Sequence, residues 1–166
     1  MPNELFLRQA TLADVPAITA IYNDAILTTT ATFDLDEQSL ESRQAWFENR
    51  TDDFPVSVAE LNGRVVAYAS LGRWSDKQAY EIAAEFSLYV EPENRGRGIG
   101  RALAEHILEE AKKTTLYTII SRVTADNAIS IRLHEQLGFT KIGVMRRCGR
   151  KFGGILDVLF LQKVLK

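Results

Sequence analysis

Residues 95–101 read Arg-Gly-Arg-Gly-Ile-Gly-Arg and stand between an apolar, strand-like run and a long amphipathic segment. Glycines at alternate positions let the backbone approach a bulky anion and turn several N–H groups toward it. A helix that follows such a loop begins with unpaired N–H groups and the positive end of its dipole. Three arginines add full positive charges. The stretch therefore predicts a phosphate-binding loop between a strand and a helix.

Two common phosphate-binding loops do not match this stretch. A Walker loop needs a Lys followed by Ser or Thr at a fixed place, and none stands there after Gly96 or Gly98. A dinucleotide loop needs the spacing Gly-x-Gly-x-x-Gly near the first strand of a βαβ unit, whereas the spacing here is Gly-x-Gly-x-Gly, past the middle of the chain. A plain surface turn rich in glycine and arginine is the alternative.

The flanking segments argue against a plain turn. Residues 85–90 carry the aromatic and aliphatic side chains typical of a strand, and Pro92 ends it. After the loop, apolar residues recur at helical spacing as far as Ala111, while charged residues occupy the other face. The predicted order is strand, anion loop, helix.

The rest of the chain alternates predicted strands and helices. We expect helices from Thr11 through Ile26, from Ser39 through Phe47, from the anion loop to about Lys113, and at 128–137. Strands are predicted at residues 6–9, 56–61, 64–71, 80–90, 117–123, 140–147 and 156–164. This mixture predicts one α/β domain over residues 1–166, with a central sheet and helices on both faces.

Composition narrows the class of protein. The chain has 46% hydrophobic and 25% charged residues, as ordinary globular proteins do, and a net charge of −2 that argues against a nucleic-acid partner. No apolar stretch is long enough to cross a membrane, and the first residues lack the pattern of a signal peptide. Cys148 is the single cysteine, which favours a cytoplasmic location. Cys148 could be a nucleophile, but a lone cysteine is more often a small packed residue.

Three segments together carry a resemblance to a known family. Arg95, Gly98 and Gly100 fit the pattern Arg/Gln-x-x-Gly-x-Gly/Ala, which resembles the first cofactor motif of the GNAT N-acetyltransferases. Residues 127–139, which end in Gly-Phe, resemble the second cofactor segment of that family. The C-terminal segment 149–158 resembles the phosphinothricin and methionine sulfoximine N-acetyltransferase subfamily.

This resemblance implies a function and a fold. The function is acetyl-CoA-dependent transfer of an acetyl group to the primary amine of a small amino acid or analogue, without a metal ion. The fold is a mixed, mostly antiparallel sheet of about seven strands with a splayed, V-shaped opening for acyl-CoA. The resemblance also implies a homodimer.

The resemblance assigns three catalytic residues. The backbone N–H of Val90 would stabilise the negative charge that develops on the thioester oxygen, an effect of about 2.7–4 kcal/mol for single donors elsewhere. Glu85 would take the proton of the amine, and burial in an apolar run would raise its proton affinity. Glu81, on the same face of a regular strand but ~13 Å away, is the competitor. His134 would protonate the departing thiolate or only pack beside the cofactor sulfur.

The resemblance also assigns binding residues. Asn127 would bond the pantetheine amides, or act only as a helix cap. The expected cofactor-binding set is Leu88, Tyr89, Val90, Arg95, Gly96, Arg97, Gly98, Ile99, Gly100, Arg101, Asn127 and Ser130. The expected acceptor-binding set is Phe33, Arg73, Trp74, Tyr80 and Glu85, with Lys151, Phe152 and Asp157 as weaker candidates.

One departure bears on the acceptor. Subfamily members that act on methionine sulfoximine carry an Arg after the Trp of a Gly-Asp-Trp-Arg segment, but this chain reads Gly-Arg-Trp-Ser at residues 72–75. Arg73 could reach in from the other side of Trp74. A second subfamily Arg is replaced by Glu81. Beside the small-molecule acetyltransferase, two alternatives stay open: a non-catalytic acyl-CoA sensor, and a protein lysine or N-terminal acetyltransferase.

Overall fold

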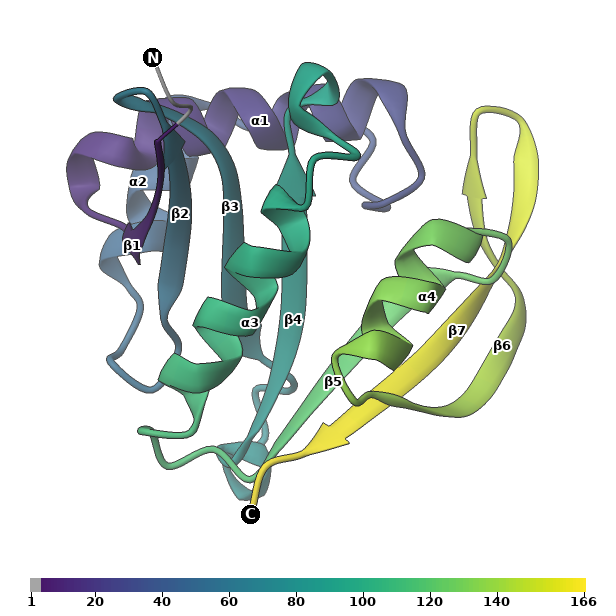
Figure 1. Cartoon of the computed structure of the whole chain (residues 1–166). Helices are drawn as coiled ribbons and strands as arrows, with labels where there is room; N and C mark the ends of the chain where they lie inside the picture. The colour runs from purple at the N-terminus through teal and green to yellow at the C-terminus, as the bar shows by residue number, and fades with distance from the viewer. Residues whose placement is uncertain (1–3) are drawn as a thin grey trace.

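The computed structural model describes residues 4–166, and over these residues seven strands form one sheet (Figure 1). Across the sheet the order is β1-β2-β3-β4-β5-β7-β6, and every neighbouring pair is antiparallel except β4 and β5, which are parallel. The prediction of a mixed, mostly antiparallel sheet is confirmed. The strands are β1 (Leu5–Gln9), β2 (Val56–Leu61), β3 (Arg64–Arg73), β4 (Ala83–Val90), β5 (Thr118–Thr124), β6 (Thr140–Lys151) and β7 (Gly154–Val164).

Four α-helices in the described residues cover both faces of the sheet, as expected. The helices are α1 (Val15–Thr28), α2 (Leu40–Glu48), α3 (Ile99–Ala111) and α4 (Ala128–Gln136). In Figure 1, α3 and α4 lie in front of the sheet and α2 lies behind it. On the α1 side, Ile18 and Ile21 pack against Val58 and Tyr68. On the α3 side, the apolar face of α3 packs in the larger core cluster, where Leu103 and Ile107 are fully buried.

Local chemistry explains where the elements begin and end. Ser39 caps α2, because its side chain accepts a hydrogen bond from the backbone N–H of Ser42. Asn62 and Gly63 both have positive φ, which makes the tight turn between β2 and β3. Before α1, the carboxylate of Asp14 accepts a hydrogen bond from the backbone N–H of Thr11, 2.8 Å away. The segment after Thr11 starts as a short 3-10 turn, and α1 itself begins at Val15.

Two predicted strand boundaries are wrong. The strand expected at 80–90 begins at Ala83, because residues 78–80 form a 3-10 turn that Glu81 ends. The strand expected at 140–147 continues to Lys151, where positive φ angles at Phe152 and Gly153 make a tight turn into β7. Tyr80 and Glu81 therefore lie outside the central strand that holds Glu85.

The parallel pair β4–β5 positions the site. Its register covers three positions, Ala83 to Glu85 opposite Thr118 to Ile120, and the strands then diverge. Figure 1 shows them as the two arms of a V. Beyond Glu85, the edge of β4 that faces β5 has no strand partner within residues 4–166, so the expected splayed opening is present.

Candidate functional site

The glycine loop has the backbone that an anion cradle requires. Gly96 and Gly98 have φ of 71° and 79°, in the left-handed region that favours glycine, and the space above both is open. Gly98 is the N-cap of α3, so the loop leads straight into the unpaired N–H groups of the helix. The side chain of Ile99 is buried in the core, which fixes the first turn of α3 to the sheet. These residues fit a diphosphate held by main-chain amides.

Gly100 serves a different purpose. A Cβ at Gly100 would lie 3.3 Å from Cγ2 of Val90 and 3.5 Å from Cδ2 of Leu88. The absence of a side chain lets the start of α3 approach β4 closely. The anion cradle therefore lies next to the open part of β4.

The three loop arginines are exposed and make separate contacts. Arg95 donates a hydrogen bond from Nε to the carbonyl oxygen of Val90 at 3.0 Å. Arg97 donates to Oδ1 of Asn94 at 2.8 Å, and Arg101 forms an ion pair with Glu105. Their charges surround the loop, and Arg95 in addition ties the loop to the end of β4.

The open edge of β4 presents backbone groups to the gap. The N–H of Glu91 donates to the carbonyl oxygen of Val66 in β3. Because successive N–H groups of a strand point in opposite directions, those of Val90 and Leu88 point away from β3, toward the opening. The N–H of Tyr89 points to β3 instead, and its side chain packs against Tyr22 and Tyr68 on the α1 side. The N–H of Tyr89 therefore does not face the opening, although Tyr89 is one of the residues that line the pocket.

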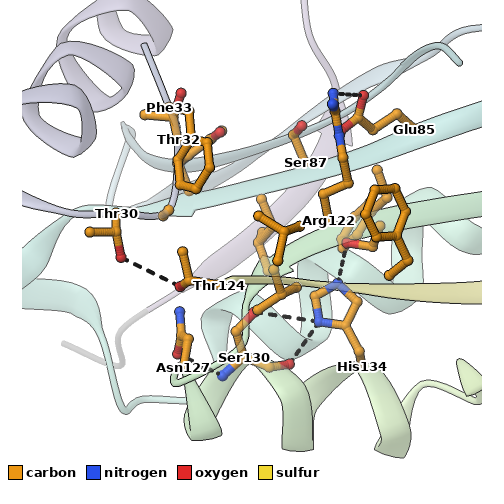
Figure 2. Close-up of a pocket in the computed structure, with 18 of the residues that line it drawn as sticks. Thr30, Thr32, Phe33, Glu85, Ser87, Arg122, Thr124, Asn127, Ser130 and His134 are labelled. Atoms are coloured by element: carbon orange, nitrogen blue, oxygen red, sulfur yellow. Dashed lines mark hydrogen bonds and ion pairs between the residues drawn. The ribbon is translucent and has the colours of Figure 1, made fainter. Parts of the chain in front are cut away.

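A pocket with a cavity volume of about 550 Å³ occupies this opening. Its α4 side is lined by Phe86, Leu88, Ser121, Asn127, Ser130 and His134, and its α1 side by Glu85, Ser87, Arg122 and the segment 30–34. Because side chains alternate along β4 and β5, the two sets point to opposite faces of the sheet and meet at the gap. Figure 2 shows Glu85 and Ser87 on one side and His134 on the other.

Glu85 lies at the vertex of the V, in surroundings that differ from the prediction. Its carboxylate accepts two hydrogen bonds from Arg122, from Nε at 2.6 Å and from Nη2 at 2.7 Å (Figure 2). The side chain of Glu85 is 23% exposed and that of Arg122 is 53% exposed. The hydrogen bonds that Arg122 donates to Glu85 raise the pKa of Arg122 above its ordinary value. The expected apolar environment of Glu85 is therefore wrong: an ion pair takes its place.

His134 is buried on the α4 side of the gap. Its Nε2 lies 2.7 Å from Oγ of Ser121, and its Nδ1 lies 2.7 Å from the carbonyl oxygen of Ser130. The ring also packs edge-on against Phe86 and Phe139. Burial lowers the pKa of His134.

Asn127 caps α4, because its Oδ1 accepts a hydrogen bond from the backbone N–H of Ser130 at 3.1 Å. Its side chain also lines the pocket, and Figure 2 shows its amide nitrogen turned away from the helix. A helix cap and a contact with pantetheine are therefore compatible roles for Asn127.

The structure brings together only part of the expected acceptor set. Phe33 lines the pocket, and its ring occupies the space that a side chain at Gly149 would need. Trp74 lies behind the ion pair, with the Arg122 guanidinium 5.7 Å from its ring centre. Arg73 is not among the lining residues and lies over the ring of Phe54 instead. Tyr80 is exposed in its 3-10 turn and is also outside the lining.

The weaker acceptor candidates, Lys151, Phe152 and Asp157, do not line the pocket. Nζ of Lys151 donates to the carbonyl oxygen of Thr32 at 2.8 Å, which ties the loop after α1 to β6. Asp157 accepts a hydrogen bond from the backbone N–H of Arg147 at 2.7 Å, and Phe152 is exposed.

Sequence reasoning missed Arg122, Ser121 and, apart from Phe33, the loop segment 30–34. Arg122 is the one charged residue in a strand of apolar and hydroxyl side chains, and that contrast was the available signal. Within residues 4–166, no cluster of three or more His, Cys, Asp or Glu side chains could hold a metal ion. None of the helices in that range is both long and apolar enough to span a bilayer.

Comparison with known proteins agrees with this geometry. The family model described as "Acetyltransferase (GNAT) domain" matches residues 7–160. The L-methionine sulfoximine/L-methionine sulfone acetyltransferase of Pseudomonas aeruginosa is 40% identical over 158 residues, which are 94% of this chain and 92% of that protein.

Two solved structures are close in fold. An acetyltransferase from Salmonella typhimurium, solved with its cofactor acetyl-CoA, has a TM-score of 0.95 and 39% identity, with 99% of this chain and 95% of that chain covered. A ribosomal-protein-alanine N-acetyltransferase from Brucella melitensis has a TM-score of 0.93 and 45% identity, with 96% and 99% covered. Because the family model spans nearly the whole sequence, the chain belongs to the GNAT acetyltransferases.

Proposed function

We propose that the chain transfers the acetyl group of acetyl-CoA to the primary amine of a small amino acid or amino-acid analogue, of the methionine sulfone, methionine sulfoximine or phosphinothricin type. One observation carries the proposal: a carboxylate, Glu85, stands where β4 and β5 part, and the pocket beside it is also lined by Leu88 on the open edge of β4 and by Asn127 and Ser130 at the start of α4. A base and an acyl-donor site therefore meet in one cavity.

The chain's own residues fit the donor. Main-chain amides of residues 96–101 would hold the diphosphate, and the N–H groups of Leu88 and Val90 would pair with pantetheine as an added strand. Ser130 and Asn127 would line the other side of that arm. When bound, acetyl-CoA supplies an activated acetyl thioester.

Two groups would then carry the chemistry. The N–H of Val90 points into the gap and would donate a hydrogen bond to the thioester oxygen as negative charge develops there. The Arg95 side chain donates a hydrogen bond to the carbonyl oxygen of the same residue, which ties the anion loop to the end of β4 beside that N–H. Glu85 would take the proton of the attacking amine, directly or through water.

The acceptor half of the pocket supports a small substrate with a side chain of moderate length. Phe33, Met145, Val158 and Phe160 line it and supply apolar contacts. The relative from Pseudomonas aeruginosa, named for methionine sulfoximine and methionine sulfone, supports the same class.

The test is a screen for release of CoA thiol from acetyl-CoA with methionine sulfone, methionine sulfoximine, phosphinothricin and the common L-amino acids. Saturable release with at least one of them supports the proposal, and absence of release across the panel contradicts it. A silent acyl-CoA sensor would bind acetyl-CoA tightly and give no release, and the Glu85→Gln change would then alter nothing.

A protein acceptor is the second candidate, because the Brucella melitensis neighbour is named for acetylation of a ribosomal-protein alanine. Incubation of the enzyme with acetyl-CoA, a cell lysate and free amino acids separates the two. Acetylated protein without acetylated amino acid would favour this second candidate, and the reverse favours the first.

We also propose a cytoplasmic homodimer without nucleic-acid or membrane partners. The exposed thiol of Cys148 and the net charge of −2 support a reducing compartment and a small-molecule role. Strand β6 exposes Ile142 and Val144 at the edge of the sheet, apolar side chains that a second copy would cover. Sedimentation of Val144→Asp should then show a monomer where the parent chain sediments as a dimer.

A further inference from the structure

A single fixed positive charge lines the pocket. Among the lining residues within 4–166, Arg122 is the only Lys or Arg, while Glu85 and Asp34 are the acidic ones. Asp34 already accepts a hydrogen bond from the hydroxyl of Tyr22. A carboxylate that enters this pocket therefore meets one group able to neutralise it.

Arg122 has hydrogen-bonding capacity left over. Glu85 occupies its Nε and one hydrogen of Nη2, and Nη1 makes no hydrogen bond within the described residues. A guanidinium carries five N–H groups, so its Nη1 edge remains for a second carboxylate. The exposed fraction of the Arg122 side chain, 53%, leaves that edge accessible from the cavity.

The position of Arg122 is fixed by more than the ion pair. Its guanidinium lies 5.7 Å from the ring centre of Trp74, and that ring packs edge-on against Phe160. The side chain thus projects along an aromatic wall beside Glu85. An arginine held in one orientation loses less conformational freedom when it binds a ligand.

The spacing of the pair matches an α-amino acid. In such a molecule the ammonium and the carboxylate are attached to the same carbon. Glu85 and Arg122 are in direct contact, at 2.6 and 2.7 Å. A carboxylate bound to Arg122 would consequently place the amine beside Glu85, the group that has to take its proton.

From this arrangement we infer that Arg122 binds the α-carboxylate of the acceptor, so that the Arg122–Glu85 pair recognises both charges of a free amino acid. This role rests on the proposed function and specifies its substrate class. It also supplies the cation that the sequence lacks at Ser75 and Glu81. An acceptor without a carboxylate at that place, such as an amide or a peptide N-terminus, would forgo this contact.

The experiment compares L-methionine sulfone with its α-carboxamide in steady-state release of CoA thiol. For Arg122→Gln, kcat/KM for the free acid should fall ~10- to 100-fold, as expected for loss of a charged, hydrogen-bonded contact, mainly through KM. For the amide, kcat/KM should change less than ~3-fold, because that ligand has no carboxylate. Arg122→Lys keeps the charge but not the planar fork and should lie between the two.

A second measurement uses a ligand that cannot itself be acetylated. The des-amino analogue of methionine sulfone keeps the carboxylate and has no amine, so it should inhibit the parent enzyme competitively and lose that inhibition in Arg122→Gln. Arg132→Gln, a change at an exposed arginine of α4 outside the pocket, is the matched control and should retain both readings.

The outcomes are distinct. If Arg122→Gln lowers kcat/KM equally for the acid and the amide, Arg122 acts only through Glu85. That result overturns the inference, while the proposed function stands. Retained inhibition by the des-amino analogue would overturn it as well. If the parent enzyme acetylates neither the acid nor the amide, the proposed acceptor class itself is wrong, and the inference falls with it.

Discussion

Nε2 of His134 and Oγ of Ser121 lie 2.7 Å apart across the α4 side of the opening. The other ring nitrogen, Nδ1, lies 2.7 Å from the carbonyl oxygen of Ser130, which can only accept a hydrogen bond. Nδ1 therefore carries the hydrogen, and Nε2 accepts one from the Ser121 hydroxyl. Burial lowers the pKa of His134 and so favours this neutral ring. A neutral ring in this tautomer has no proton on Nε2 to give to a thiolate, which supports a packing role.

Replacement of this histidine tests the point. His134→Phe should lower kcat less than about tenfold, whereas loss of a working general acid typically costs ~10²- to 10⁴-fold. The same change should lower the free energy of unfolding by about 1–3 kcal/mol, because the Ser130 carbonyl and the Ser121 hydroxyl lose their partner. Steady-state thiol release and urea unfolding measure the two effects. His106→Phe on α3 is the control for kcat, and a hundredfold fall confined to His134→Phe would restore the acid role.

Burial of His134 also predicts a pH dependence of stability. In the unfolded chain a histidine takes up a proton near its ordinary pKa of 6.5, while in the folded chain His134 does so only at lower pH. Proton uptake therefore favours unfolding as the pH falls below about 6.5. Urea unfolding at pH 7 and pH 5 should show a loss of stability that is smaller in His134→Phe. Equal losses in the two proteins would mean that the folded chain protonates this ring as readily as the unfolded one.

The anion loop and the order of elements could be predicted because their signals are local. The alternate glycines of residues 95–101 and the helical spacing of apolar residues after them need no tertiary information. The two faces of β4 were also readable: Phe86 and Leu88 alternate with Glu85 and Ser87, so the apolar neighbours of Glu85 in sequence point to the other face. Its polar surroundings could thus have been foreseen.

The ion-pair partner of Glu85 could not have been predicted from the sequence. Arg122 lies 37 residues further along the chain, and the contact depends on the register of β4 against β5. Tyr80 and Arg73 lie outside the pocket lining for a related reason. The short 3-10 turn before Ala83 removes Tyr80 from the strand, and Arg73 turns to the Phe54 ring at the far end of β3. Neither the 3-10 turn nor the orientation of the Arg73 side chain produces a periodic pattern in the sequence.

The role of Glu85 as the base has a matched test. Glu85→Gln keeps the shape and can still accept hydrogen bonds from Arg122, but it cannot take a proton from an ammonium. We expect kcat/KM for the acceptor to fall ~10²- to 10⁴-fold. The affinity for acetyl-CoA, measured by calorimetry, should stay unchanged, because Glu85 lies on the acceptor side of the gap. Glu81→Gln, at an exposed residue outside β4, should keep full activity. A Glu85→Gln enzyme within about threefold of the parent would assign the proton transfer to another group.

The anion loop can be tested by comparison of two glycines with the same backbone strain. Gly98 and Gly63 have φ of 79° and 80°, and a Cβ would meet open space at both, so Ala should cost about 1–2 kcal/mol of stability at either position. Gly98 is the N-cap of α3, so an alanine there would strain the backbone where the N–H groups must keep their direction to hold a diphosphate. Because the loop relieves this strain by turning those amides, we expect Gly98→Ala to weaken acetyl-CoA binding, measured by calorimetry, ~5- to 30-fold. Gly63→Ala, in the turn between β2 and β3, should lower the unfolding temperature with no change in affinity. Similar affinities for the two variants would show that the loop amides do not bear on the diphosphate.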